Sequence, residues 1–333
     1  MEYRKLGKFG TRLSSIGIGG WLTYGGATED SVAHQCLEEA VEQGINFIDV
    51  ADIYARGESE KVVGDFLTDY EREDFVISSK VFFPMTDKPN DRGLSRKHIT
   101  ESIEQSLARL RTDYLDFYFC HRYDYHTPLE ETVRSMNHLL DEGLINYWGI
   151  STWFPDEIER AHRIAENLGM VGPAVSQPRY NLLDRWIEIE LRQTIDYNGM
   201  GVVPWSPLAQ GVLTGKYNDG IPEESRHSTY NKLPDRELNE DVIAKLNEVE
   251  EISKEQDITL TQLSLAWILS HDWITAPIVG ASKPGQVTEN AAAGDIHLDQ
   301  DTINRIEEIM DNEPQHHPIY RRINYRQYLN GEL

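Results

Sequence analysis

The chain alternates short apolar segments with amphipathic segments of helical length, and this alternation limits the folds that it can adopt. Apolar segments this short suit the buried strands of a parallel sheet, because helices on both faces bury such strands completely. Eight strands joined by crossovers predict a closed parallel (β/α)8 barrel, the TIM barrel, rather than an open sheet. We expect the eight strands at residues 16–19, 46–49, 75–80, 115–120, 145–150, 174–177, 201–205 and 276–280.

Further segments complete the predicted barrel. Residues 1–15 read as an N-terminal β-hairpin, with strands at 2–6 and 11–15, that caps the bottom of the barrel. Residues 206–239, after the seventh strand, form a long loop rich in Gly, Pro and polar side chains, which is typical of a lid or binding segment. We expect a first helix that begins after Thr28 and ends at Gly44. Further helices are expected at 58–68, 95–110, 128–142, 155–168, 240–256 and 284–293, followed by an extra helix at 300–310 and a tail at 311–333.

Composition restricts the partners and the compartment. The 333 residues show no linker or break in composition, so we expect one domain over residues 1–333. A formal net charge of -24 disfavours nucleic acid and anionic lipid as partners. The longest apolar runs are strand-sized, which predicts no membrane insertion. No apolar leader follows Met1, and Cys36 and Cys120 are the only cysteines, so we expect a cytoplasmic protein. The excess of acidic residues also fits a salt-rich cytosol. An ordinary acidic soluble protein fits the composition equally well.

Three consecutive strands end in a titratable residue. The second strand ends in Asp49, with Tyr54 five residues later, the third ends in Lys80 and the fourth in His121. Because the carboxyl ends of parallel strands meet at one rim of a barrel, we expect these four side chains to form one proton-transfer site.

The chemistry of these four residues suits the reduction of a carbonyl group. Tyr54 can give a proton to a carbonyl oxygen if a neighbouring cation lowers the pKa of its phenol, normally about 10, and Lys80 can supply that charge. Asp49 would hold the Lys80 ammonium, and His121 would orient the substrate oxygen. Taken singly, each residue could equally be structural, as an ion pair or a core histidine. Four of them at successive strand ends favour a catalytic site.

A hydride must come from a cofactor, because no side chain can supply one. The usual dinucleotide fingerprint is missing, since the glycines at 17–20 are followed by Trp21 and Leu22 without the last glycine of the motif. The segment 280–284, Gly-Ala-Ser-Lys-Pro, follows the eighth strand and opens a helix, which is where barrels bind phosphate. The same segment is also an ordinary helix start.

The pattern Asp49-x-Ala51-x-x-Tyr54, with Lys80 and His121, resembles the catalytic tetrad of the aldo-keto reductase superfamily over nearly the whole chain. Within the superfamily the sequence is most similar to the β-subunits of voltage-gated potassium channels and their microbial relatives. The stretches that carry this similarity lie at residues 93–99, 147–149, 205–209, 215–217 and 220–222. The resemblance implies an NADPH-dependent carbonyl reductase with a small carbonyl substrate, and a homo-oligomer, a tetramer in the family.

The resemblance also assigns cofactor residues. Trp21 would line the nicotinamide side, Ser151 and Gln177 would bind the carboxamide, and Trp205 would stack on the ring. The remaining contacts would come from Ser206, Leu208 and Lys216 for the pyrophosphate, Arg226, Ser282 and Gln286 for the adenosine phosphate, and Glu289 and Asn290 for the adenine.

Some positions depart from the family pattern. Thr152 stands where the superfamily commonly has Asn and the channel subunits have Arg. Gly280 and Gln286 occupy positions where the wider superfamily often has Lys and Arg on the 2′-phosphate. The preference for NADP therefore rests on Arg226 and Ser282, and NADH stays an alternative cofactor. The chain keeps His121 where channel subunits often have Asn, which implies catalytic competence.

Two other hypotheses remain open on the sequence alone. The first is a redox-sensing regulatory subunit that binds NADPH and docks on a membrane channel. The second is a barrel enzyme that uses Lys80 as a Schiff-base nucleophile, which a neighbouring Asp49 makes less favourable. We expect no metal site, because His121, His126, His316 and His317 lack ligand spacing.

Overall fold

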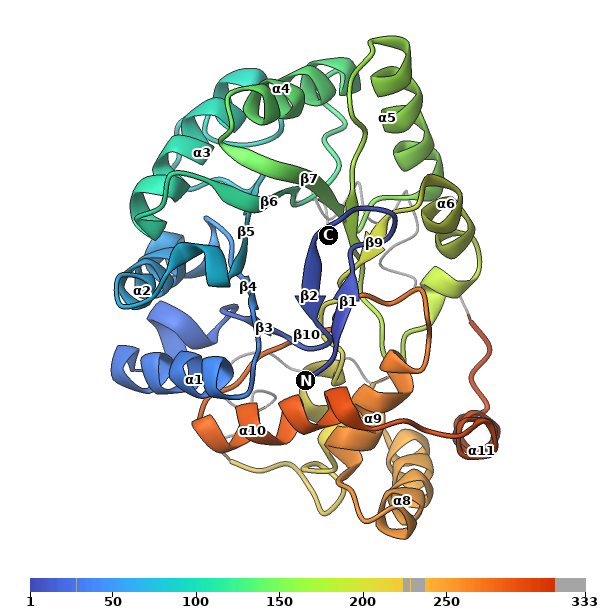
Figure 1. The fold of residues 1–333 in the computed structure, drawn as a ribbon. Coiled ribbons are helices and arrows are strands. Elements are labelled where there is room, and N and C mark those ends of the chain that lie inside the picture. Colours follow the sequence, from blue (N-terminus) through green and yellow to red (C-terminus); the bar gives the residue numbers. More distant parts are fainter. Residues whose placement is uncertain (28, 224–227, 229–236, 315–333) are drawn as a thin grey trace.

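The centre of the protein is a sheet of eight parallel strands, and helices surround it in Figure 1. The structure is a computed structural model that describes residues 1–27, 29–223, 228 and 237–314. The strands of this sheet are β3 (Gly17–Gly19), β4 (Phe47–Asp49), β5 (Val76–Val81), β6 (Leu115–Cys120), β7 (Ile145–Ser151), β8 (Val175–Gln177), β9 (Gly201–Val202) and β10 (Ile278–Val279).

The sheet closes on itself. Its strand order is β10-β3-β4-β5-β6-β7-β8-β9, with every neighbour parallel. Beyond the short strand β9, Trp205 forms a parallel bridge with Ile278, and the Ile278 amide donates to the Pro204 carbonyl at 2.8 Å. The predicted (β/α)8 barrel is therefore confirmed, with the eight strands close to their expected positions.

A hairpin closes the lower end of the barrel, as predicted. Its antiparallel strands are β1 (Tyr3–Lys5) and β2 (Arg12–Ser14), which lie across the middle of the ring in Figure 1. Leu6 and Leu13 are fully buried against Phe47 and other apolar side chains of the barrel interior. The hairpin thus fills the amino ends of the strands, and the carboxyl ends form the other mouth.

The helices start where the sequence offers caps. Ser95 accepts a hydrogen bond from the His98 amide at 3.3 Å, and Thr259 forms a capping box with Gln262. The helices are α1 (Asp30–Glu42), α2 (Glu58–Leu67), α3 (Arg96–Leu110), α4 (Leu129–Asp141), α5 (Pro155–Asn167), α6 (Leu191–Asn198), α8 (Glu240–Glu255), α9 (Leu260–Leu269), α10 (Pro284–Ala292) and α11 (Gln300–Met310).

The sequence predicted neither α6 nor α9. Helix α9 is buried on every side, with nine of its ten residues buried, so it lacks the alternation of apolar and polar faces that indicates a surface helix. Helix α6 has only eight residues, which is too short to show a clear period. The other predicted helices are present to within a few residues.

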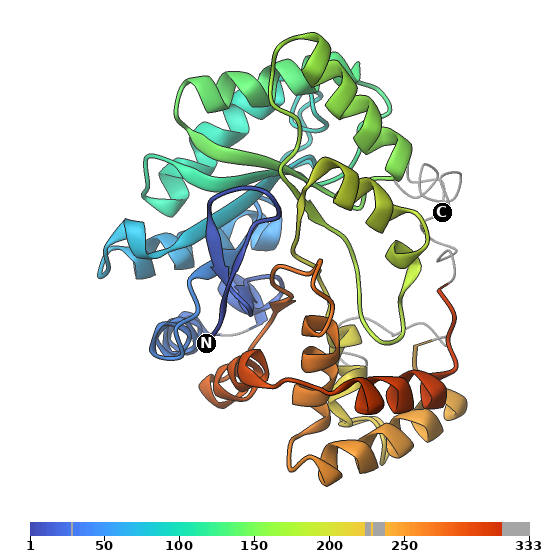
Figure 2. The same cartoon turned by 45° about the vertical axis from the view of Figure 1, so that its right-hand side comes forward.

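The extra helix α11 packs on α8, and Figures 1 and 2 both show the two side by side. Arg305 pairs with Glu255 at 2.8 Å, and Lys245 donates to the Met310 carbonyl at 3.0 Å. Residues 311–314 have no regular structure. The rest of the predicted tail, 315–333, and the loop residues 224–227 and 229–236 lie outside the described residues.

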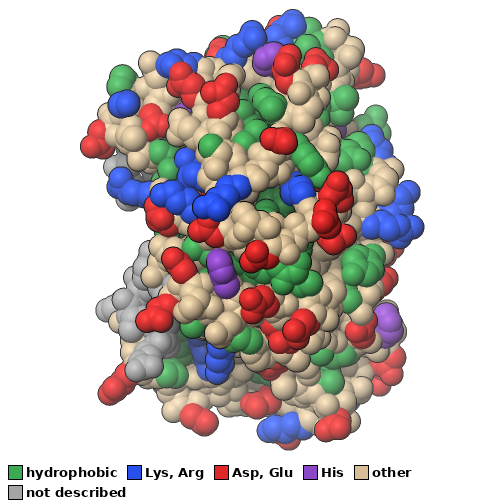
Figure 3. Space-filling model, turned by 60° about the vertical axis from the view of Figure 1, so that its left-hand side comes forward, with side chains coloured by type: hydrophobic (Ala, Val, Ile, Leu, Met, Phe, Trp, Pro, Cys, Tyr) green, Lys and Arg blue, Asp and Glu red, His purple; other side chains and the backbone are tan. Residues whose placement is uncertain are grey.

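The surface mixes charges of both signs. Figure 3 shows a band of Lys and Arg side chains bordered by Asp and Glu on the face that carries α1 to α3. On that side, the exposed Lys61 of α2 pairs with Glu58 at 2.6 Å, and Arg111 after α3 pairs with Asp65 of α2. Within the described part of the chain, helix length and hydropathy nowhere reach what a membrane crossing requires.

Two helical glycines test the packing of this helical layer. A Cβ on Gly64 of α2 would lie 2.3 Å from the Arg109 carbonyl oxygen of α3, whereas one on Gly285 of α10 would meet nothing within 4 Å. We expect Gly64→Ala to lower the free energy of unfolding by about 1–3 kcal/mol, because backbone must move. Gly285→Ala should raise it by up to about 1 kcal/mol. Urea denaturation measures both, and equal stabilities would contradict the close approach of α2 and α3.

Candidate active site

The site is built around an ion pair at the upper end of the barrel. The Lys80 ammonium is fully buried and donates to Asp49 Oδ2 and to the Val50 carbonyl, both at 2.7 Å. Asp49 Oδ1 accepts from Ser78 Oγ at 2.6 Å and from Gln177 Nε2 at 2.9 Å. Strand pairing aligns Asp49 with Ser78, and alternation along β5 carries Lys80 to the same side. Each charge therefore has several partners, as burial requires.

Tyr54 and His121 complete the group. Tyr54 follows β4 in a tight turn, and the Lys80 ammonium lies 4.7 Å from the centre of its ring. The His121 ring stands edge-on to the Tyr54 ring, with 5.9 Å between their centres. The structure thus brings together all four side chains that the sequence singled out at successive strand ends, although their catalytic roles stay a prediction.

The pKa of the Tyr54 phenol lies above its ordinary value, which is opposite to the direction expected from the sequence. Burial is the largest cause and raises it, and the Asp49 carboxylate raises it further. The charge of Lys80 and its hydrogen bond with the phenol lower the pKa, but they offset only part of the rise. In this structure the phenol is therefore protonated at neutral pH, ready to donate.

The pKa values of Lys80 and His121 are shifted in opposite directions. Burial lowers the pKa of Lys80, but Asp49 and Tyr54 together raise it more, so the net shift is upward and the ammonium is retained. A retained ammonium argues against Lys80 as an amine nucleophile. Burial lowers the pKa of His121 well below its usual value, and Arg122 and Lys80 add to the effect. His121 is therefore a neutral imidazole at neutral pH.

Two residues beside this group were missed by the sequence analysis. The Phe83 ring stands edge-on to His121 at 5.0 Å, and the Arg122 guanidinium lies 5.5 Å from the Phe83 ring centre. Arg122 Nη1 also donates to the His121 carbonyl and lies 3.4 Å from Ser151 Oγ. Phe83 follows the strand that carries Lys80, and Arg122 directly follows His121. Their position after these strand ends was the one feature of the sequence that could have indicated them.

The predicted carboxamide residues form a connected pair. Ser151 and Gln177 are aligned on β7 and β8, and both are buried. Ser151 Oγ donates to the main-chain carbonyl of Gln177 at 2.9 Å. Next to them, Thr152 is buried with a φ of 57°, which is rare for a β-branched residue. Its hydroxyl has no hydrogen-bond partner among the described residues. A buried hydroxyl in that state fits a site that receives a polar ligand.

Two predicted tryptophans lie at the rim. Trp21 is 41% exposed, just after β3, and the following Leu22 has a φ of 67°. Trp205 is half-buried, and the Arg179 guanidinium lies 5.6 Å from its ring centre. Both rings thus keep accessible surface at the mouth of the barrel, which suits contact with a flat ligand.

The segment after Trp205 has an unusual backbone. Ser206, Ala209 and Gln210 have φ values of 51°, 46° and 58°, and Gly211 continues at 99°. A Cβ on Gly211 would lie 2.5 Å from Lys216 Nζ, so the ammonium folds back on this backbone. Successive amides in such conformations form concave anion sites. The half-buried Leu208 lies in the same segment, whereas the predicted Arg226 lies outside the described residues.

The remaining predicted cofactor residues follow β10. Gly280 is exposed, and the Ser282 amide and hydroxyl donate to Gln286 Oε1 at 2.8 and 3.2 Å. One turn further along α10, Glu289 accepts from Thr259 Oγ1 at 2.8 Å, and Asn290 is 3% exposed. Because Trp205 pairs with Ile278, this segment lies beside the one after Trp205.

These groups have the chemistry that a nicotinamide dinucleotide needs. They comprise an amide and a hydroxyl side chain at neighbouring strand ends, two aromatic rings with accessible surface, and a lysine ammonium folded back on a backbone with positive φ values. No three His, Cys, Asp or Glu side chains of the described residues are arranged to hold a metal ion. His316 and His317 lie outside that part of the chain.

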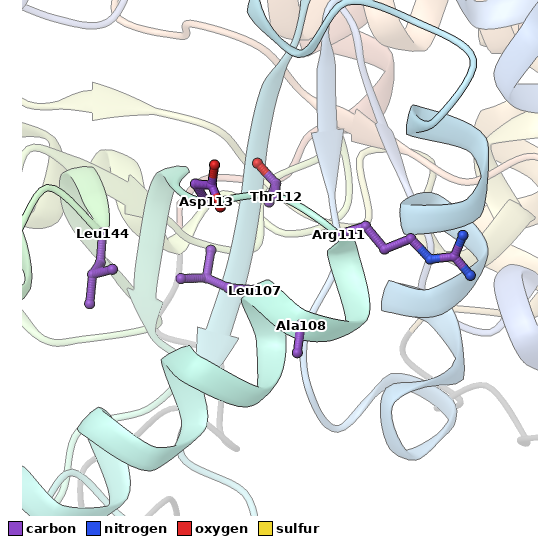
Figure 4. A pocket seen from close by; sticks show the side chains of 6 residues that line it. All are labelled: Leu107, Ala108, Arg111, Thr112, Asp113 and Leu144. Atoms are coloured by element: carbon purple, nitrogen blue, oxygen red, sulfur yellow. The ribbon is translucent and has the colours of Figure 1, made fainter.

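A separate pocket of about 420 Å³ lies at the opposite end of the barrel (Figure 4). Its residues come from the end of α3 and from the segments that lead into β6 and β7. Arg111 extends away toward α2, where it pairs with Asp65. This pocket is remote from the tetrad. Its lining consists of Leu107, Ala108, Arg111, Thr112, Asp113 and Leu144.

Comparison with known proteins gives one consistent result. Residues 15–311 match the aldo/keto reductase family. A probable voltage-gated potassium channel subunit beta of Arabidopsis thaliana is 40% identical over 329 residues, which cover 96% of this chain and all of the relative. The protein of the same name from Oryza sativa is equally similar. A putative subunit of this kind from Schizosaccharomyces pombe is 42% identical over 94% of both chains.

Removing one partner of the buried ion pair tests its energetics. Lys80→Met leaves the Asp49 carboxylate buried without its cation, and we expect the free energy of unfolding to fall by about 3–5 kcal/mol. The double variant Lys80→Met with Asp49→Asn should recover much of that loss, because neither position 49 nor position 80 then carries a buried charge. A double variant no more stable than Lys80→Met would contradict the pairing, and denaturant titration measures all three proteins.

The neutral His121 makes stability depend on pH. Its folded pKa is below the unfolded value, about 6.5, so the unfolded chain binds the proton first as the pH falls. The contribution is complete above the unfolded pKa and declines as the pH falls toward the folded pKa, by up to about 1.4 kcal/mol per pH unit. Wild type should therefore lose more stability than His121→Asn between about pH 7.5 and 5.5. Parallel losses would contradict the neutral imidazole.

Proposed function

The chain belongs to the aldo/keto reductase family, and we propose that it is an NADPH-dependent oxidoreductase that reduces aldehydes or ketones to alcohols, with Tyr54 as the general acid. One observation carries the proposal. A protonated phenol lies 4.7 Å, ring centre to ammonium, from a buried lysine and beside a neutral imidazole. This arrangement can polarise a carbonyl oxygen and then give it a proton.

The roles follow from the charges. Tyr54 gives its proton to the carbonyl oxygen, and the Lys80 ammonium stabilises the phenolate that remains. Asp49 holds that ammonium through the 2.7 Å contact and keeps it charged. The neutral His121 donates a hydrogen bond to the same oxygen and so orients the substrate. The exposed Trp21 and the Phe83 ring supply apolar walls for a small carbonyl compound.

The predicted cofactor residues bind the dinucleotide. When bound, NADPH supplies the hydride that reduces the carbonyl carbon. The side-chain nitrogen of Gln177 donates to Asp49, so the side-chain carbonyl oxygen of Gln177 stays available to accept from the nicotinamide carboxamide. Trp205 offers a ring face, and Lys216 offers a charge for the pyrophosphate. Ser282 and Arg226 favour NADPH, whereas the lack of a Lys at position 280 and of an Arg at position 286 leaves NADH as an alternative.

A second function has support from the relatives. Three relatives are named as probable or putative voltage-gated potassium channel subunits beta, and they match this chain over nearly its whole length. A regulatory subunit of a channel that senses the redox state through bound NADPH is therefore the competing proposal. Under either function we expect a cytoplasmic protein of one domain that forms a homo-oligomer, a tetramer by family resemblance.

Replacing the phenol separates catalysis from binding. Tyr54→Phe removes the proton donor but keeps the ring, so we expect kcat for aldehyde reduction to fall by at least about 100-fold. The dissociation constant for NADPH, measured by the quenching of tryptophan fluorescence, should stay within about twofold, because the phenol acts on the substrate. An undiminished kcat in this variant would contradict Tyr54 as the acid.

Wild-type turnover separates the two proposed functions. The reductase should oxidise NADPH with members of a broad aldehyde panel, measured at 340 nm. Stoichiometric NADPH binding without turnover on any aldehyde or ketone would favour the regulatory subunit.

A further inference from the structure

Strand β5 has a second polar face, directed away from the tetrad. Lys80 faces the barrel interior, whereas its neighbour Ser79 faces outward, where it donates to Glu60 Oε1 at 2.5 Å. Glu60 is completely inaccessible, and its other oxygen accepts from Arg109 Nε at 2.6 Å. These contacts tie β5, the first turn of α2 and the end of α3 together at one point. We call Asp52, Glu60, Ser79, Arg109 and Tyr118 the outer cluster.

Asp52 adds a second buried carboxyl group to the outer cluster. It is 1% exposed, its Oδ1 accepts from the Ile53 amide at 2.6 Å, and its Oδ2 has no hydrogen-bond partner among the described residues. Burial, and then the charge of Glu60, raise the pKa of Asp52 well above its usual value. The buried hydroxyl of Tyr118 is also without a hydrogen-bond partner in the described structure. Arg109 pairs with Glu60, whereas no ion pair joins Asp52 to a cation within the described residues. Asp52 is therefore the carboxyl group that we expect to carry a proton.

Between Asp52 and Glu60 lies the turn that presents Tyr54. Ala55 and Arg56 have φ values of 48° and 53°, and Gly57 has 90°. Left-handed conformations at non-glycine residues cost about 1–3 kcal/mol each and persist only where the surroundings hold them. A Cβ on Gly57 would lie 2.8 Å from Arg109 Cδ, so the arginine packs directly on this turn. The strained turn is thus held at its start by Asp52 and at its end by Arg109 and Glu60.

We propose that the outer cluster positions Tyr54, so that Glu60, Arg109 and Asp52 are positioning residues for proton donation. Within the described residues, no hydrogen bond or ion pair joins any of the three to a tetrad side chain. Ser79 joins Glu60 to the strand that carries Lys80, and Arg109 joins it to the turn that carries Tyr54. The outer cluster therefore sets the distance between the Tyr54 phenol and the Lys80 ammonium through Ser79, the residue before Lys80, and through Gly57, three residues after Tyr54. The kinetic part of this inference rests on the proposed reductase function, whereas the conformational part does not.

Glu60→Gln tests the proposal, with Glu58→Gln as its matched control. Glu58 lies in the same turn of α2, but it is exposed, and its one ion pair within the described residues is with the exposed Lys61 at 2.6 Å. In Glu60→Gln we expect kcat to fall about tenfold or more, with KM and the NADPH dissociation constant within about twofold, because misplacement of the acid affects the chemical step. Glu58→Gln should match wild type. A cluster that only stabilised the fold would lower the denaturation midpoint and leave kcat unchanged.

Hydrogen exchange of the backbone amides gives a readout that needs no turnover. The amides of Ile53 and Arg56 should exchange about tenfold faster in Glu60→Gln than in wild type or Glu58→Gln, since their turn is released. Faster exchange in a protein without any reductase activity would remove the proposed function but support the positioning role. Unchanged exchange and unchanged kcat would overturn the inference.

Two milder variants keep the test decisive if Glu60→Gln fails to fold. Ser79→Ala removes only the hydrogen bond between β5 and Glu60, and we expect about a threefold loss of kcat with unchanged KM. Asp52→Ala removes the oxygen that accepts from the Ile53 amide at 2.6 Å, so it should also lower kcat while KM stays within about twofold. Full activity in Ser79→Ala, or a Ser79→Ala protein with wild-type exchange at Ile53, would count against the outer cluster.

Discussion

A lysine with no exposure to solvent dominates the architecture of this protein. Burying an ammonium ion costs several kcal/mol unless its partners are placed well, and here Asp49 and the Val50 carbonyl both lie 2.7 Å away. Ser78 and Gln177 in turn bind the carboxylate from two other strands. Because these partners come from strands β4, β5 and β8, the ion pair requires the barrel to be closed and in register. The same requirement leaves Tyr54 and His121 little freedom at the rim.

Backbone strain is concentrated at the same end of the barrel. Of the ten described non-glycine residues with positive φ, three, Arg111, Asp257 and Asp311, follow helix ends, where such conformations are common. The others lie in loops that follow barrel strands, and each such residue costs about 1–3 kcal/mol. A rigid barrel can hold that strain, and the result is a mouth whose groups are fixed before any ligand arrives. These strained residues are Leu22, Ala55, Arg56, Thr152, Ser206, Ala209 and Gln210.

The sequence predicted the parts of the protein that have a strong period or lie at strand ends. The barrel, its hairpin cap and the meeting of Asp49, Lys80 and His121 follow from strand order alone. Helix α9 could not be found, because a helix buried all round shows no polar face. The direction of the Tyr54 pKa depends on burial, which spacing does not reveal. The contact of Arg109 with Gly57 joins two elements far apart in sequence, and no local pattern indicates it.

The most direct test of the account is the fate of the transferred hydride. With NADPH carrying deuterium at C4 on the transferring face, the account predicts an alcohol with one deuterium on the former carbonyl carbon per molecule of NADPH oxidised. Mass spectrometry of the product measures this. A product alcohol without deuterium, with both C4 faces tested, would contradict a barrel mouth in which Tyr54 protonates a carbonyl beside bound NADPH.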